Sequence, residues 1–369
     1  MKRIDFEKGI VNHGDWSRLS VCMKRAANGE RLTLGFLGGS ITQGSLASTP
    51  ETCYAYRVYQ WWTEKFPKAK IQYINAGIGG TTSQFGVARV EEDLLRFHPD
   101  VIFIEFSVND DNNPHFRETY EGLVRRVYGP ALVLIHNVRY DDVTSAEEMH
   151  LQIGKHYDLP CVSMKSTIYP EVAAGRIPNR EITPDDLHPN DLGHAMVARV
   201  VTHLLDKIYE KTLTGEWEHP QNALLPAPLT ANQYQCSIRY QNHNSSPILE
   251  GFTPDPEPQQ HITQTFRRGF TAGRVGDTAT FFVEGTGIAV QYRKSVTKPT
   301  PIAKVIVDDH EEEAMLLDGN FQEDWGDCLY LQTVLRHGES KCHKVEIRIV
   351  EAHENDAVPF YLVSVIGSK

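Results

Sequence analysis

The stretch RLTLGFLGGS, residues 31–40, is an apolar run that ends on two glycines and a serine. A strand that is buried on both faces is expected to be continuously apolar, and small residues at its end are typical of a tight turn into a helix. The stretch alone leaves two interpretations open. Ser40 is either an ordinary turn residue, or it lies exposed at a sheet edge beside backbone N–H groups, where it would act as a nucleophile.

From residue 31 to about residue 213, short apolar runs alternate with stretches of helical spacing. The later runs are KIQYINAG (70–77), DVIFIEFSVND (100–110), PALVLIHNV (130–138) and PCVSM (160–164). Helical spacing occurs near 52–66, 83–97, 116–128, 145–157 and 191–211. This alternation predicts an α/β domain in which a parallel sheet is covered by helices on both faces. In such folds, ligands bind beyond the carboxyl ends of the strands.

The second part of the chain has a different pattern. Proline becomes frequent and helical spacing stops over 214–235, which predicts a linker. From 236 onward the runs are short and alternating, as in TATFFVEGTGIAVQYRK (278–294), which predicts a jelly-roll-like β-sandwich. We therefore expect an α/β domain over 1–213, with its core from about residue 31, and a β-sandwich domain over 236–369.

Composition excludes several classes of function. The net charge of −11 disfavours nucleic acid as a partner, because an acidic surface repels phosphates. No apolar run approaches the roughly 18 residues of a membrane span. No signal peptide is visible at the N-terminus, and the six scattered cysteines look like reduced thiols. We therefore expect a cytoplasmic protein, and we see no metal-ligand motif.

Four polar segments follow apolar runs or precede a helix, and they are GGSIT (38–42), NAGIGGTTS (75–83), SVND (107–110) and PDDLHPND (184–191). Each has an ordinary explanation when it is taken singly. A glycine-rich βα turn is mostly a turn, and NAGIGG lacks the glycine spacing of a dinucleotide site. An Asn at a strand end is commonly a helix cap. A single His among the 16 in the chain is more often an ordinary residue than a catalytic one.

Together, the four segments supply every group that acyl transfer needs. A serine nucleophile requires a general base, and histidine is the usual one. The imidazole requires a carboxylate partner, and Asp185 precedes His188 by three residues. Asp186 is the alternative partner, although the spacing favours Asp185. The Ser40 N–H, a glycine N–H and the Asn109 amide would then stabilise the oxyanion.

These residues resemble the SGNH family, a branch of the GDSL esterases and lipases, over about residues 31–210. The resemblance implies a flavodoxin-like three-layer α/β/α fold. It implies that Ser40 is the nucleophile and the first oxyanion donor, that Gly80 and Asn109 are the other donors, that His188 is the base and that Asp185 is its partner. No metal or organic cofactor is implied. The sequence departs from the family motif at Gly39, where the family has Asp.

The substrate is less clearly indicated. The segment STPETCYAYRVYQWW (48–62) is aromatic and polar, unlike a groove for long acyl chains, although Tyr56, Tyr59 and Trp62 are equally explained as helix core. Trp325 lies among acidic residues in a predicted loop. It is either an exposed platform for a sugar ring or a core residue of the sandwich.

The order of the two domains resembles that of cytoplasmic acetyl-mannan esterases of gut bacteria, which carry a C-terminal domain similar to a carbohydrate-binding module. This resemblance implies the removal of acetyl groups from imported manno-oligosaccharides. The alternatives are an acetyl-xylan-oligosaccharide esterase, a general short-chain esterase or lysophospholipase, an acetyl transferase between sugars, and a non-catalytic carbohydrate-binding protein. The sequence leaves the oligomeric state open, a homo-oligomer included.

Overall fold

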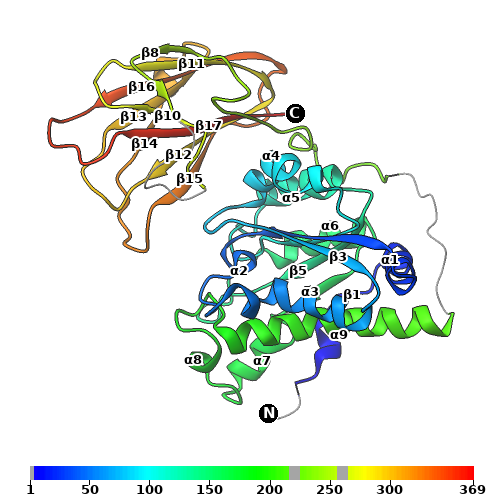
Figure 1. Ribbon diagram of the computed structural model, residues 1–369. Helices are drawn as coiled ribbons and strands as arrows, with labels where there is room; N and C mark the ends of the chain where they lie inside the picture. Colours follow the sequence, from blue (N-terminus) through cyan, green and yellow to red (C-terminus); the bar gives the residue numbers. More distant parts are fainter. Residues whose placement is uncertain (1–3, 216–224, 256–264) are drawn as a thin grey trace. The chain divides into compact units, whose positions relative to one another are not determined.

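The computed structural model describes residues 4–215, 225–255 and 265–369. The chain divides into two compact units, Met1–Asn232 and Gln233–Lys369. Figure 1 shows helices gathered around one sheet in the first unit and strands alone named in the second.

The first unit is built on a six-stranded sheet with the order β1-β6-β5-β4-β2-β3. Its strands are β1 (Ile10–Asn12), β2 (Arg31–Gly38), β3 (Lys70–Gly77), β4 (Val101–Glu105), β5 (Ala131–His136) and β6 (Cys161–Ser163). Its helices are α1 (Ser17–Ala27), α2 (Ser40–Gln43), α3 (Tyr54–Lys65), α4 (Ser83–Asp93), α5 (Pro114–Arg126), α6 (Glu147–His156), α7 (Ile168–Ala173), α8 (Asn179–Ile182) and α9 (Asp191–Thr214). Short 3-10 turns occupy Phe6–Gly9, Pro50–Thr52 and Leu95–Phe97.

Strands β2 to β6 run parallel, and β1 pairs antiparallel with β6 at the edge. The order β3-β2-β4-β5-β6 is the flavodoxin-like order, so the predicted α/β fold is confirmed. The chain crosses to β3 on one side of β2 and returns to β4 on the other side. This reversal opens a crevice at the carboxyl end of β2, which is where the chain reaches Ser40.

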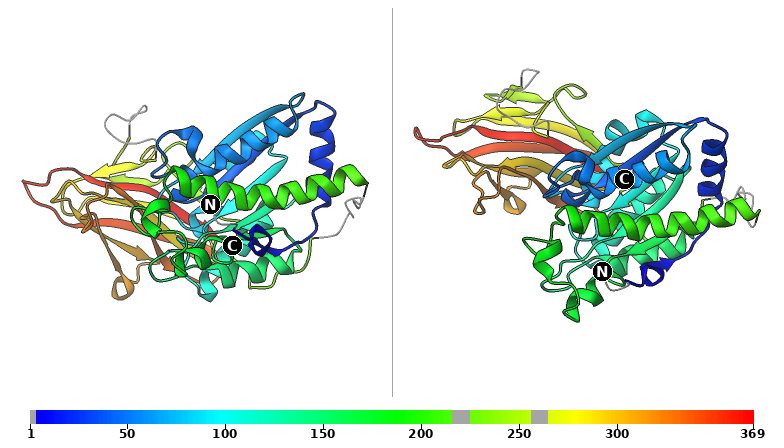
Figure 2. Two further views of the ribbon diagram at one scale, coloured as in Figure 1. Left: turned by 90° about the horizontal axis from the view of Figure 1, so that it is seen from below. Right: turned by 60° about the horizontal axis from the view of Figure 1, so that its bottom comes forward.

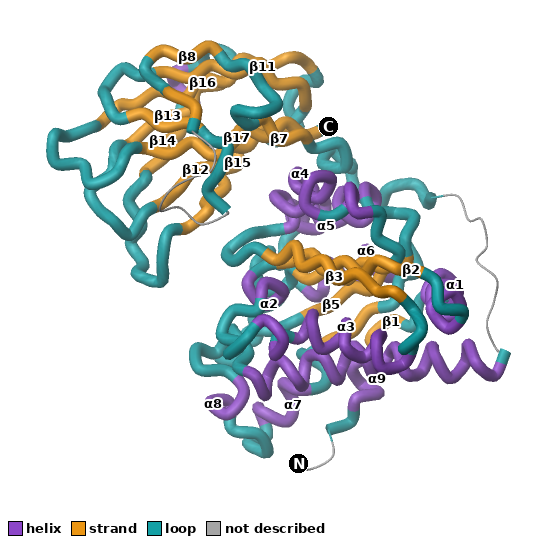
Figure 3. Tube along the Cα trace, in the orientation of Figure 1, coloured by secondary structure: helices purple, strands orange, loops and turns teal. Residues whose placement is uncertain are grey.

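Helices cover both faces of this sheet, as Figures 1 and 3 show. One layer contains α1, α3 and α9, and the other contains α4, α5 and α6. Figure 2 shows the long helix α9 running beside α3. Strand side chains alternate between the layers, so Phe36 and Phe103 stack at 4.6 Å in the α3–α9 core. The continuous burial of β2, β4 and β5 explains why their sequences are apolar throughout.

The structure adds elements that sequence periodicity did not indicate. The expected core began near residue 31, but α1 buries Leu19 and Met23 against the α3–α9 layer. Strand β1 has only three residues, which is too short to show an alternating pattern. The helix expected over 83–97 ends at Asp93 and is followed by the 3-10 turn Leu95–Phe97.

The second unit consists of two antiparallel sheets, which confirms the predicted all-β domain. One sheet has the order β15-β12-β17-β10-β9, with β7 paired to β17, and the other has the order β14-β13-β16-β11-β8. The strands are β7 (Ile238–Tyr240), β8 (Ile248–Glu250), β9 (Thr253–Pro254), β10 (Phe270–Ala272), β11 (Thr278–Gly285), β12 (Gly287–Lys294), β13 (Ile302–Val307), β14 (Met315–Asp318), β15 (Cys328–Leu335), β16 (Lys341–Glu351) and β17 (Phe360–Ser368). Side chains of both sheets, such as Val290 and Ile347, share one core, as in a sandwich.

The segment between the two units is only partly described. Residues 216–224 of the expected linker lie outside the described residues. The stretch 226–230 is bound to the first unit, because Glu121 on α5 accepts hydrogen bonds from the Leu229 N–H at 2.6 Å and the Thr230 N–H at 2.7 Å. A buried carboxylate requires such donors. This stretch therefore behaves as part of the first unit.

Candidate active site

Ser40 lies where β2 turns into the short helix α2, and only small residues fit before it. A Cβ added to Gly38 would lie 2.2 Å from Thr42 Oγ1, and one added to Gly39 would lie 2.1 Å from Asn109 Oδ1. A side chain at position 39 would therefore require the Asn109 amide to shift. In this chain Gly39 lets Asn109 lie against the backbone beside Ser40.

Three side chains form a continuous hydrogen-bonded chain at this point. The hydroxyl of Ser40, which is 6% exposed, lies 2.8 Å from Nε2 of His188. On the other side of the imidazole, Nδ1 lies 2.6 Å from Oδ2 of Asp185. This is the geometry of a nucleophile, a general base and an orienting carboxylate. The structure therefore brings together the three residues that the sequence analysis proposed as a triad.

Asp185, and not Asp186, is the carboxylate beside His188. The second oxygen of Asp185 accepts from the backbone N–H of His188 at 2.7 Å and of Leu187 at 3.0 Å. Partial burial acts to raise the pKa of Asp185, but the hydrogen bonds from His188 and Leu187 outweigh it and hold the pKa below its ordinary value. Asp186 has a φ of 67° and turns away to pair with Arg180 at 2.7 Å.

The proposed oxyanion donors come from three adjacent strand ends. Gly38 at the end of β2 is in register with Gly77 of β3 on one side and with Glu105 of β4 on the other. Ser40 follows the first of these ends. Gly80 and Asn109 follow the other two. Because the carboxyl ends of parallel strands meet at one edge, sheet register brings the three residues to the same edge of the sheet.

The loop after β3 makes one glycine amide available. The Gly79 N–H donates to Oε1 of Gln43 at 2.7 Å, which fixes the loop to helix α2. Gly80 follows with a φ of 67°, a conformation that favours glycine. Its N–H has no hydrogen-bond partner among the residues that the structure describes. The amide of Gly80, unlike that of Gly79, therefore remains available as a donor within the described residues.

Asn109 sits in a tight turn after β4. The N–H groups of Asn109 and Asp110 both donate to the carbonyl of Phe106, at 3.0 and 2.9 Å. The Asn109 Oδ1 atom is buried against Gly39 and has no partner among the described residues. This packing leaves the Asn109 side-chain N–H groups as the donors of its amide.

A buried arginine that the sequence analysis missed joins two of the strand ends. Arg89 on α4 is 1% exposed and donates to the carbonyls of Ala76 at 2.7 Å and Gly38 at 3.1 Å. It also pairs with Asp93 at 2.9 Å. Burial lowers the pKa of the guanidinium, and Asp93 opposes this effect. The only signal in the sequence was that Arg89 lies among the apolar residues of FGVARV (85–90).

The loop between α2 and α3 is held by the start of α9, the helix that follows His188. Asp191 accepts hydrogen bonds from the Ser48 N–H at 2.8 Å and from the Thr52 hydroxyl at 2.7 Å. These bonds, together with a second one from Ser48, lower the pKa of Asp191 to about 2. One turn later, Nε2 of the buried His194 lies 3.1 Å from the Ser45 carbonyl. Asp191 and His194 therefore hold the loop that follows α2, the helix that begins with Ser40.

The aromatic residues considered for substrate binding divide into core and surface. Trp62 is fully buried in the α3–α9 core, whereas Tyr56 and Tyr59 are partly buried and contact Tyr73. In the second unit, Trp325 lies in the loop between β14 and β15 and is 56% exposed. Its indole N–H donates to Glu323 at 2.5 Å. Trp325 is thus a surface residue of its unit, not part of the sandwich core.

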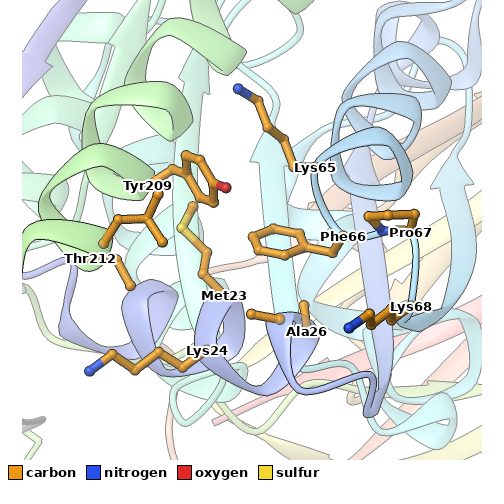
Figure 4. Close-up of a pocket in the computed structure, with 11 residues that line it drawn as sticks. Met23, Lys24, Ala26, Lys65, Phe66, Pro67, Lys68, Tyr209 and Thr212 are labelled. Carbon is orange, nitrogen blue, oxygen red and sulfur yellow. The ribbon is translucent and has the colours of Figure 1, made fainter.

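A pocket elsewhere in the first unit is separate from this site. Figure 4 shows it between α1, the end of α3 and the end of α9. Its volume is about 340 Å³. Its lining includes Met23, Phe66 and Tyr209. Phe66 precedes the start of β3, so the pocket lies at the amino ends of the strands, opposite to Ser40.

The described residues contain neither a cluster of metal ligands nor a helix that could cross a membrane. Over 4–215, 225–255 and 265–369, no group of three or more His, Cys, Asp or Glu side chains is arranged to hold a metal ion. Within the same part of the chain, no helix has the length and apolar character to span a membrane.

Comparison with known proteins agrees with this geometry. Residues 36–196 match the GDSL-like Lipase/Acylhydrolase family. Two crystal structures of a two-domain esterase (CEX) active on acetylated mannans, one co-crystallised with mannopentaose, are each 58% identical to the chain with a TM-score of 0.95. The alignments cover 100% of this chain and 98% and 99% of the other chains. A weaker likeness, with a TM-score of 0.41 and 19% identity, links 52% of the chain to 97% of Axe2, an acetylxylan esterase from Geobacillus stearothermophilus. Among curated proteins, none matches.

Proposed function

The chain belongs to the GDSL-like lipase and acylhydrolase family as a serine ester hydrolase, and from this premise we propose that it removes acetyl groups from manno-oligosaccharides. The observation that carries the chemistry is the unbroken chain from the Ser40 hydroxyl through His188 to Asp185, with distances of 2.8 and 2.6 Å. The observation that carries the substrate class is the likeness, over the whole chain, to an esterase active on acetylated mannans.

The first half of the reaction forms an acyl-enzyme. His188 Nε2 takes the Ser40 proton while Oγ bonds to the acetyl carbonyl carbon. The carbonyl oxygen becomes an oxyanion that the N–H groups of Ser40, Gly80 and Asn109 bind. The tetrahedral intermediate collapses, the sugar C–O⁻ group leaves, and His188 returns the proton to it. Asp185 keeps the imidazole in the tautomer with Nδ1–H and stabilises the imidazolium.

The second half releases acetate. His188 takes a proton from water, and the hydroxide attacks the acetyl carbon of acyl-Ser40. The same three donors bind the new oxyanion. Collapse expels the Ser40 oxygen, which regains its proton from His188. Every proton passes through one imidazole, so the site needs His188 to be neutral at the start of each half-reaction.

We propose that the second unit helps to hold the oligosaccharide. An indole ring that is exposed on a loop offers a flat apolar face, and sugar rings pack well on such faces. Trp325 has this exposure, and its ring packs at right angles to that of Phe321, with the ring centroids 5.0 Å apart. The contact with Phe321 limits the freedom of the indole, so less entropy is lost when a sugar binds.

We also propose that the protein acts in the cytoplasm on oligosaccharides that have already been imported. All six of its cysteines are free, four of them buried. Unpaired cysteines in this number are usual in a reducing compartment, where disulfides do not persist.

The test is acetate release from acetylated manno-oligosaccharides, with acetylated xylo-oligosaccharides and an aryl acetate measured beside them. The proposal predicts the highest kcat/KM on the mannan pieces and no turnover by Ser40→Ala. It further predicts that Trp325→Ala raises KM for oligosaccharides and leaves the aryl acetate unaffected. A preference for xylan pieces, or for longer acyl chains, would overturn the assigned substrate while leaving the esterase chemistry in place.

A further inference from the structure

A buried carboxylate and a buried imidazole lie directly behind Asn109. Asp110 and His150 both have fully buried side chains, and Asp110 Oδ2 lies 3.0 Å from His150 Nε2. Burial raises the pKa of Asp110 and lowers the pKa of His150, which favours the pair without a separation of charge. Neither residue contacts the triad, and the reaction steps described above do not use them.

The second oxygen of Asp110 reaches the other oxyanion loop. Its Oδ1 accepts a hydrogen bond of 2.8 Å from the backbone N–H of Ser83, the first residue of α4. Ser83 follows Gly80 by only three residues. One carboxylate is therefore adjacent in sequence to the donor Asn109 and hydrogen-bonded close to the donor Gly80.

His150 is itself held in place. It lies on α6 with its ring stacked on Tyr120 at a centroid distance of 3.6 Å and an interplanar angle of 5°. Ala146, the residue before α6, donates its N–H to the Ser107 carbonyl at 2.7 Å, which joins the start of this helix to the segment that leads into Asn109. The imidazole thus joins a rigid helix to the carboxylate of Asp110.

We infer that Asp110 and His150 are positioning residues of the oxyanion hole, and that they fix the Asn109 amide relative to the Gly80 N–H. This inference rests on the proposed function, because it takes these two groups as the oxyanion donors. The donors come from separate loops, and nothing in sheet register fixes their separation within the tenths of an ångström that matter for catalysis. The carboxylate of Asp110 fixes this separation, because Asp110 is adjacent to Asn109, bonds to the loop of Gly80 through the Ser83 N–H and is held by His150. A buried polar pair gives little net stability, which fits a role in geometry.

The test exploits the different reach of two amide side chains. In His150→Gln the amide nitrogen falls near the position of Nε2 and keeps the hydrogen bond to Asp110. In His150→Asn the side chain is one methylene shorter and cannot reach. The matched control is His136→Asn, because the His136 ring is equally buried, lies 6.0 Å from that of His150, and has no hydrogen-bond partner for either nitrogen among the described residues.

Two measurements separate positioning from a general loss of structure. One is kcat and KM on an aryl acetate, with kcat expressed per active site titrated by a fluorophosphonate. The other is the inhibition constant of phenylboronic acid, whose tetrahedral adduct on Ser40 places an oxygen where the oxyanion forms. We expect His150→Asn to lower kcat by roughly 10- to 100-fold with KM within about twofold, and to weaken phenylboronic acid by a similar factor. His150→Gln and His136→Asn should stay within about threefold of the wild type.

A folded His150→Asn with wild-type kcat overturns the inference, as does an equal loss of kcat in His136→Asn. If His150→Asn does not fold, the hydrogen bond between Asp110 and the Ser83 N–H is tested in its place. Ser83→Pro removes the N–H donated to Asp110 at a first helical position, where proline is tolerated. Ser83→Ala keeps this N–H and loses only the hydroxyl, which is hydrogen-bonded to Thr119 at 2.7 Å and also interacts with Asp110. The inference requires kcat to be lower in the proline variant than in the alanine variant. If Asn109→Ala also leaves kcat unchanged, the proposed oxyanion hole itself fails, and not only this inference.

Discussion

The two sides of the candidate active site are built in opposite ways. The base side is local, because Asp185 and His188 lie three residues apart on one loop, and the Asp185 side chain is 45% exposed. The oxyanion side is assembled from three strand ends and is supported by the buried side chains of Arg89 and Asp110. Substitutions on the base side should therefore remove activity while the fold persists. Substitutions beneath the oxyanion side should affect stability as well.

The largest effect separates two neighbouring carboxylates on the base side. Asp185→Asn should lower kcat by roughly 10⁴-fold, because an amide favours the wrong tautomer of His188. Asp186→Asn should stay near the wild type, since Asp186 pairs with Arg180 on the far side of the loop. Steady-state kinetics on an aryl acetate, with thermal unfolding of both variants, checks this. Equal losses in the two variants would contradict the assignment of Asp185 as the partner.

The next effect falls on the oxyanion side. Asn109→Ala should lower kcat by roughly 10²- to 10³-fold, the usual cost of one oxyanion donor, with little change in KM. Gly39→Ala is the companion variant, because its new Cβ would lie 2.1 Å from Asn109 Oδ1 and displace the amide. We expect kcat to be lower than in the wild type in both variants. Normal kcat in Asn109→Ala would show that this side chain does not bind the oxyanion.

A third prediction concerns stability rather than activity. Arg89→Met should lower the free energy of unfolding by roughly 3 kcal/mol, because the carbonyls of Gly38 and Ala76 lose a buried charged donor and Asp93 loses its partner. Arg96→Met, at an exposed position three residues after the same helix ends at Asp93, should change the free energy of unfolding by less than about 0.5 kcal/mol. Denaturant titration of both variants decides the matter. Equal effects would mean that Arg89 does not support the strand ends.

The smallest effect is a pH dependence on the base side. The pKa of Asp191 is lowered from 3.8 to about 2 in the folded protein, so its contribution to stability is complete above its unfolded value and is lost as the pH falls towards 2. The melting temperature of Asp191→Asn should therefore lie below that of the wild type at pH 6, and the gap should close in acid. A gap that does not depend on pH would show that the charge of Asp191 is not responsible.

The sequence predicted the base side almost completely, because Asp185, His188 and the helix after them lie within one short segment. The α/β and all-β parts were also predictable, since β2, β4 and β5 are buried on both faces and the strands of the second unit alternate. Arg89 and the pair of Asp110 with His150 were not predictable. Their partners are backbone groups and side chains that only the fold brings close, 40 residues away in the case of His150. The short strand β1 carries too few residues for a pattern.

The most direct test of the central claim, that Ser40 is the nucleophile activated by His188, is covalent labelling with a fluorophosphonate followed by peptide mass spectrometry. The account predicts one phosphonyl group per chain, located on Ser40, with labelling abolished in Ser40→Ala and strongly slowed in His188→Ala. A label on another residue, or labelling of Ser40→Ala at the wild-type rate, would contradict it.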